Sequence, residues 1–146
     1  MKEGYSIIKK IHLPTDYNSL VDVEALVGSV CEKLGVVEDA YGNVLIAVTE
    51  AVNNAIEHGN EMNKDLSVEV SVGDDDSSFC FNVMDQGNGF DYTNLPDPTS
   101  PENLLKENGR GIFLMKNLAD EVEFDAPGNS VNMYFNKWFT SKILMA

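Results

Sequence analysis

The chain has 146 residues, and its 24 acidic against 10 basic side chains give a formal net charge of −14. A chain of this length forms about one domain and buries roughly two thirds of its surface, so it needs no disulfide or metal to fold. Phosphate groups would be repelled on average, which makes direct binding to nucleic acid or to an anionic membrane a poor expectation. Cys31 and Cys80 lack zinc or redox spacing, and no signal peptide or membrane-spanning run is recognisable, so we expect a cytoplasmic protein.

The first part of the chain predicts one strand and two helices. β-Branched residues mixed with lysines predict an edge strand over residues 5–13, and apolar residues at helical spacing predict a helix over residues 17–34. A second helix is expected to start after Glu38-Asp39 and to run to about His58, where Gly59-Asn60 is a stop signal. Its core-facing stripe consists of Tyr41, Leu45, Val48, Val52 and Ala55.

The second part of the chain predicts two pairs of strands separated by a loop and a helix. Alternation marks strands around residues 66–72 and 79–83, joined by a turn over residues 73–77. Residues 91–108 contain three of the five prolines and little periodicity, which is typical of a functional lid or a disordered loop. A short helix over residues 111–118 and a hairpin around residues 127–129 follow. Strand pairs alternating with helices indicate a single two-layer α+β sandwich.

The first segment that suits chemistry lies on the second predicted helix. Glu50 and Asn54 are one turn apart and share a face that lies away from the apolar stripe. An amide oxygen suits Mg²⁺, and a nearby carboxylate can accept a proton from an attacking hydroxyl. Taken alone, this pattern is more typical of a solvated helix face. His58 would stabilise the helix end or lie near phosphates, and the helix-end role is favoured.

The second segment, residues 85–90, follows a predicted strand. Gly87 and Gly89 let the backbone turn sharply and approach a ligand, and the Asp85 carboxylate can accept an amine hydrogen such as that of adenine. Taken alone, it is a weak signal that a simple strand-exit turn also explains.

The third segment, residues 109–115, opens a predicted helix. Gly109 and Gly111 would free backbone N–H groups to bind an anion at the helix start. Arg110 would contact phosphate or pair with a carboxylate of the protein itself, whereas Ile112 would serve mainly as core. A flexible entry to a core helix is the alternative.

In this order, the three segments resemble the N, G1 and G2 boxes of the GHKL ATPase superfamily, which includes gyrase, Hsp90, histidine kinases and MutL. Residues 48–55 (VTEAVNNA) and 111–122 (GIFLMKNLADEV) look closest to the anti-sigma factor serine kinases. The resemblance covers nearly the whole chain, because that family is also a single domain of about this length.

The resemblance implies a histidine kinase-like ATPase (Bergerat) fold over residues 1–146, with helices on one face of a mixed, mostly antiparallel sheet and an ATP lid over about 91–108. It makes Glu50 the general base and Asn54 the Mg²⁺ ligand. It makes Asp85 the partner of the adenine amine. The nucleotide-binding set that it implies is Asn54, His58, Asp85, Gly87, Gly89, Phe90, Gly109, Arg110, Gly111 and Ile112.

The leading hypothesis is an ATP- and Mg²⁺-dependent serine/threonine protein kinase that regulates transcription. By resemblance, it would bind a sigma factor in one state and phosphorylate a small anti-anti-sigma (STAS-type) protein in another. A non-catalytic module, in which ATP only stabilises a shape that a partner recognises, is the alternative. A stand-alone domain like that of a histidine kinase is disfavoured, because neither histidine lies in a separate helical hairpin. The sequence is compatible with a homodimer.

Overall fold

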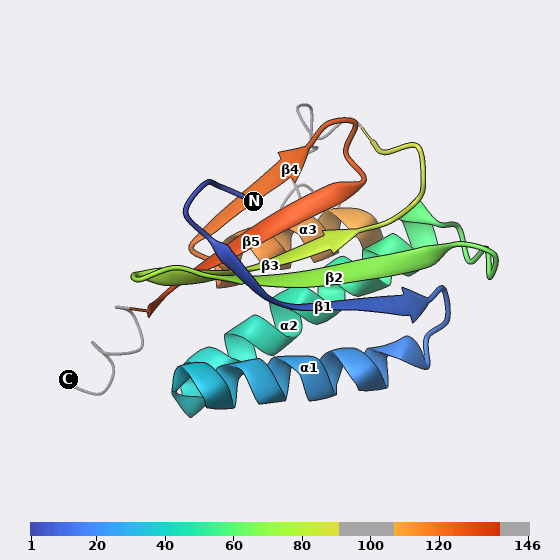
Figure 1. The fold of residues 1–146 in the computed structure, drawn as a ribbon. Coiled ribbons are helices and arrows are strands. Elements are labelled where there is room, and N and C mark those ends of the chain that lie inside the picture. Colours follow the sequence, from blue (N-terminus) through green and yellow to red (C-terminus); the bar gives the residue numbers. More distant parts are fainter. Residues whose placement is uncertain (91–106, 138–146) are drawn as a thin grey trace.

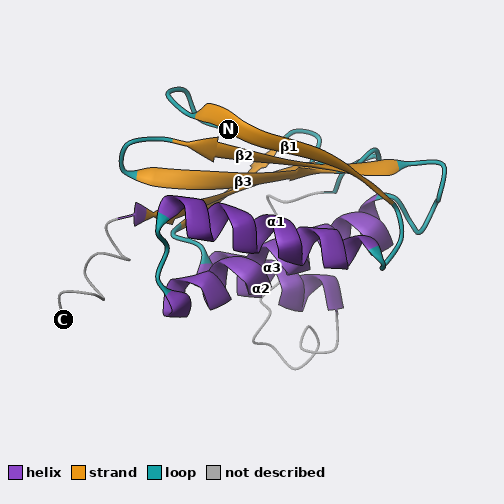
Figure 2. Ribbon diagram, turned by 60° about the horizontal axis from the view of Figure 1, so that its bottom comes forward, coloured by secondary structure: helices purple, strands orange, loops and turns teal. Residues whose placement is uncertain are grey.

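The computed structural model describes residues 1–90 and 107–137. Within these residues, a five-stranded sheet forms one layer and the helices form a second layer against one of its faces (Figures 1 and 2). The two-layer α+β sandwich with helices on one face is therefore confirmed. None of the described helices is long and apolar enough to cross a membrane.

The sheet has the strand order β1-β2-β3-β5-β4, and all the described strand pairs are antiparallel. This agrees with a mostly antiparallel sheet, and β1 lies at its edge as expected. The turn between β2 and β3 and the hairpin between β4 and β5 also lie where the sequence predicts them. The strands are β1 (Ser6–Pro14), β2 (Ser67–Asp74), β3 (Ser78–Met84), β4 (Glu121–Asp125) and β5 (Ser130–Asn136).

Helix α1 (Ser19–Leu34) ends at Gly35, which adopts the left-handed conformation that glycine tolerates best. Helix α2 (Glu38–Asn54) continues as a π-helix, η1 (Ala55–Gly59), so the helical segment ends close to the predicted position. In the wider π turn, the Asn60 backbone N–H donates to the Ala55 carbonyl at 2.8 Å. The change from α to π geometry is not visible in the apolar periodicity.

Helix α3 (Glu107–Leu118) begins four residues earlier than the predicted residue 111. Gly109 and Gly111 therefore lie inside its first turns. A glycine inside a helix costs about 1 kcal/mol relative to alanine, which packing of the helix against its neighbours can offset. Of the predicted lid, residues 91–106 lie outside the described residues, and residues 107 and 108 begin α3.

The core lies between the sheet and the helix layer, and α2 contacts both α1 and α3. Val44, Val48 and Val52 on α2 are almost completely buried, and burial of each such side chain contributes about 1.5–3 kcal/mol. Because α2 is held in this way, the polar side chains on its remaining face are carried by a rigid support.

Candidate functional site

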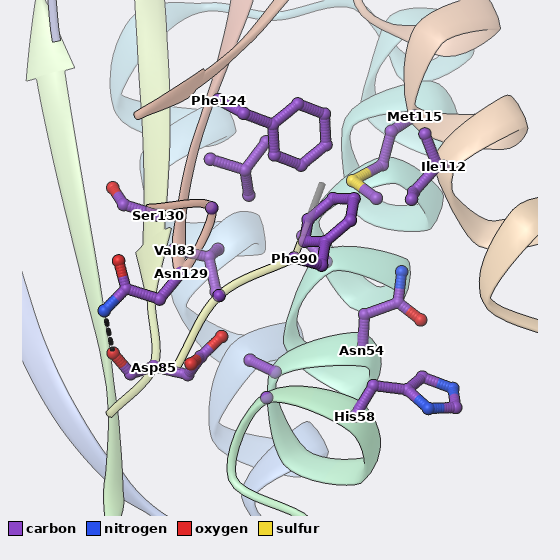
Figure 3. Close-up of a pocket in the computed structure, with 16 residues that line it drawn as sticks. Asn54, His58, Val83, Asp85, Phe90, Ile112, Met115, Phe124, Asn129 and Ser130 are labelled. Atoms are coloured by element: carbon purple, nitrogen blue, oxygen red, sulfur yellow. Dashed lines mark hydrogen bonds between the residues drawn. The ribbon is translucent and has the colours of Figure 1, made fainter. Parts of the chain in front are cut away.

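A pocket opens between η1, α3, the end of β3 and the β4–β5 hairpin (Figure 3). It encloses a cavity of about 110 Å³, and the space grows to about 630 Å³ when the open solvent at its mouth is included. Residues from all three predicted segments line it, namely Asn54, His58, Asp85, Gly89, Phe90 and Ile112.

The wall formed by α2 and η1 carries the first segment. Asn54 is half-buried, and His58 lies one turn further along at the pocket rim with 45% of its side chain exposed (Figure 3). The His58 Nε2 atom lies 3.7 Å from a carboxylate oxygen of Glu57. His58 therefore combines the helix-end position favoured from the sequence with a place at the pocket.

Asp85 is the first residue after β3, and hydrogen bonds hold it on both sides. Its backbone N–H donates to the Asn129 carbonyl at 2.9 Å, and the Asn129 side chain donates to its carbonyl at 3.2 Å. One carboxylate oxygen accepts the Gly87 N–H at 2.8 Å. Burial raises the pKa of the Asp85 carboxyl, and the Gly87 hydrogen bond opposes this rise. The Asp85 carboxylate is thus a hydrogen-bond acceptor with a fixed orientation in a partly desolvated environment.

Three glycines permit the close packing around Asp85. A Cβ atom on Gly59 would overlap the Asp85 carboxylate, and one on Gly87 would overlap the Gly59 carbonyl. Gly89, with φ at 82°, lies against the Pro127 carbonyl. The sequence suggests that Gly87 and Gly89 allow the backbone to approach a ligand, and in the structure they allow the chain to approach itself.

Gly111 brings the third segment onto the first. A Cβ atom there would lie 2.9 Å from Asn54 Nδ2 and 3.1 Å from Glu50 Oε2. The α3 backbone therefore packs directly on the two polar side chains of α2, and of these two only Asn54 lines the described pocket. Ile112 lines the pocket and also belongs to the core, as expected. Gly109 and Arg110 lie in α3, and the Arg110 side chain is outside the described part of the structure.

The site also contains residues that the sequence pattern does not single out. Phe124 on β4 meets Phe90 edge to face, with ring centroids 5.2 Å apart. Asn129 and Ser130 enter the pocket because β5 pairs with β3, which places Ser130 opposite Met84. The only signal for them is this strand order, which local periodicity does not reveal.

The arrangement suits a flat, mainly apolar ring that carries a hydrogen-bond donor. Phe90, Phe124, Ile112 and Met115 supply apolar walls, and Asp85 supplies a hydrogen-bond acceptor. Among the described residues, no group of three or more His, Cys, Asp or Glu side chains could hold a metal ion by itself. The Asn54 amide oxygen beside Glu50 is nevertheless the kind of donor that Mg²⁺ accepts when phosphates and waters complete its shell.

Replacing Gly111 by alanine tests the contact between α3 and α2. We expect the variant to fold with unchanged or slightly higher thermal stability, since alanine is the better helix former. Its methyl group should push Glu50 and Asn54 aside and weaken nucleotide binding roughly tenfold. Gly42→Ala is the matched control, because a Cβ atom there meets nothing within 4 Å. Equal nucleotide affinity in the two variants would contradict the prediction.

Comparison with known proteins gives a consistent result. The sequence profile of the histidine kinase-like ATPase domain family matches residues 13–135. The chain is 33% identical over 106 residues to the serine-protein kinase RsbW of Bacillus licheniformis, covering 68% of this chain and 66% of the relative. It is 29% identical over 142 residues to RsbW of Staphylococcus aureus, covering 90% and 86%.

RsbW of Bacillus velezensis is 30% identical over 122 residues, covering 78% of this chain and 75% of the relative. A crystal structure of the RsbU and RsbW domains of a Mycobacterium tuberculosis protein matches with a TM-score of 0.55 and 17% identity. It covers 88% of this chain and 32% of that chain. At this identity the structural match shows a shared fold.

Proposed function

Because the chain belongs to the histidine kinase-like ATPase family, among the anti-sigma factor serine-protein kinases, we propose that it binds ATP with Mg²⁺ and phosphorylates a serine of a partner protein. The observation that carries the proposal is that Asn54 and Asp85 line one pocket, while Glu50 lies beside Asn54 where α3 packs on α2. Packing of Gly111 on α2 and of Gly59 on the Asp85 loop brings these side chains together.

Each polar residue has a distinct role in this proposal. Asp85 accepts a hydrogen bond from the adenine amine, and the ring lies between the apolar walls. Asn54 would hold Mg²⁺ through its amide oxygen, and the ion would supply positive charge beside the phosphates. Glu50 accepts the proton of the attacking serine hydroxyl. Gly109 and Gly111 allow the phosphates to approach the first turns of α3.

The partners follow from the family. We propose that the protein acts in the cytoplasm, where it binds a sigma factor in one state and phosphorylates an anti-anti-sigma protein in another. The serine-protein kinase RsbW names of the relatives support a place in a sigma factor regulatory pathway. A net charge of −14 favours partners other than nucleic acid.

A thermal-shift experiment tests the nucleotide site first. ATP and ADP should raise the melting temperature and GTP should not, because adenine carries a donating amine at C6, where guanine carries a carbonyl oxygen that would face the Asp85 acceptor. Mg²⁺ should increase the shift with ATP. No shift with any nucleotide would overturn the proposed ATP site.

Incubation with ATP and candidate partner proteins then separates the kinase from a non-catalytic binding module. The kinase should leave an acid-stable phosphoserine on the anti-anti-sigma protein. Nucleotide binding with an unmodified partner after prolonged incubation would favour the module instead.

A further inference from the structure

Asn60, directly after η1, is a buried side chain that uses all of its hydrogen-bonding groups within the protein. Only 2% of its surface is exposed. Its Nδ2 atom donates to Thr15 Oγ1 at 2.9 Å and to the Ser67 carbonyl at 3.0 Å. Its Oδ1 atom accepts the backbone N–H of Gln86 at 2.8 Å. A single amide therefore joins the turn before α1, the start of β2 and the loop after β3.

The last of these bonds holds the peptide group that follows Asp85. Because the Asp85–Gln86 peptide group is planar, fixing its N–H also fixes the direction in which the Asp85 main chain leaves β3. Gln86 is held a second time, since its side-chain oxygen accepts the Ser67 N–H at 2.6 Å. Gly59, the neighbour of Asn60, packs on the Asp85 carboxylate itself. Asn60 thus lies between the scaffold and the one carboxylate that lines the pocket in the described structure.

We propose that Asn60 is a positioning residue for purine recognition, which it supports by holding the Asp85–Gln86 peptide through its Oδ1 atom. This inference rests on the proposed function, because it takes adenine as the ligand of Asp85. The two bonds from Nδ2 stay within the scaffold at Thr15 and Ser67, whereas the bond to Oδ1 reaches the pocket loop. Changing one end of the network at a time therefore distinguishes an effect on the stability of the scaffold from an effect on ligand recognition.

The test compares Asn60→Ala with Thr15→Val, which removes a buried hydroxyl from the scaffold end of the same network. Amide hydrogen exchange without nucleotide should become faster at Gln86 in Asn60→Ala and should keep its wild-type rate there in Thr15→Val. Asn60→Ala should weaken ATP binding roughly tenfold and reduce the preference for ATP over GTP, because the freed loop no longer presents Asp85 in one orientation. Thr15→Val should lower thermal stability and keep this preference.

Asn60→Asp is a second, near-isosteric variant that changes the scaffold end of the network. It keeps an oxygen toward the Gln86 N–H but places an acceptor against the Ser67 carbonyl. We therefore expect lower thermal stability together with slow exchange at Gln86 and the wild-type preference for ATP. Equal effects of Asn60→Ala and Thr15→Val on exchange and on nucleotide preference would show a merely structural role and overturn the inference. A wild-type protein that binds no ATP would instead overturn the proposed function, while exchange at Gln86 still reports on the Asn60 contact.

Discussion

Replacing Glu50 by glutamine should leave ATP binding within about threefold of wild type and reduce phosphoryl transfer by roughly 10²- to 10⁴-fold. The amide has nearly the same shape as the carboxylate, so the packing of Gly111 against this side chain is kept. It has no basicity, and so it cannot accept the proton of a serine hydroxyl. Single-turnover transfer to the partner protein, measured at saturating ATP, isolates this step from binding.

Glu57→Gln is the matched control for this experiment. It makes the same charge change on the continuation of the same helix, where Glu57 accepts a hydrogen bond from the Tyr17 hydroxyl at 2.7 Å. We expect phosphoryl transfer in this variant to stay near the wild-type rate. Normal transfer by Glu50→Gln would show that another group takes the proton, or that the reaction needs no general base.

Asp85→Asn should have opposite effects on ligand binding and on stability. Its amide can present an N–H group to the adenine amine, which places two donors together, so we expect ATP affinity to fall roughly 10- to 100-fold. Without nucleotide, the variant should melt at a higher temperature than wild type at pH 7. The reason is that folding desolvates the Asp85 carboxylate, as its raised pKa indicates, whereas an amide carries no charge to desolvate.

The difference in thermal stability between Asp85→Asn and the wild type should depend on pH, which provides a second test. A raised pKa in the folded state means that the stability contributed by the protonated form is lost as the pH rises through that pKa. The advantage of Asp85→Asn should therefore be largest at neutral pH and disappear below the ordinary carboxyl pKa of 3.8. Asp76→Asn, in the exposed β2–β3 turn, controls for the change in net charge. A constant stability difference from pH 3 to 7, or unchanged ATP affinity, would contradict the assignment of Asp85.

Local patterns in the sequence predict most of the framework. The alternation around Val68, Val70 and Val72 and the apolar spacing along α2 give the correct strand and helix, because each pattern reports one buried face. The spacing of Glu50 and Asn54 also places both on one side of α2 without reference to any other element. Resemblance to a known family then indicates that the three segments belong together.

Contacts between distant segments are what the sequence patterns do not reveal. Gly59-Asn60 reads as a helix stop, although the Asn60 side chain reaches Thr15, 45 residues earlier, and Gln86, 26 residues later. Gly111 reads as the start of a helix, although it lies inside α3 and packs on Glu50 and Asn54. Asn129 and Ser130 join the pocket only because β5 lies beside β3. These positions depend on the topology of the sheet.

The π turn at the end of α2 makes the length of this segment as important as its composition. A π turn spans one residue more than an α turn, so Ala55–Gly59 takes up one extra residue within a single wide turn. If the same residues continued as a regular α-helix instead, every later residue would be rotated by about 100° around the helix axis. Asn60 would turn away from Gln86, whereas Glu50 and Asn54 would keep their places. The extra residue of the π turn therefore determines how Asn60 and the Asp85 loop that it holds are oriented, around the helix axis, relative to Glu50 and Asn54.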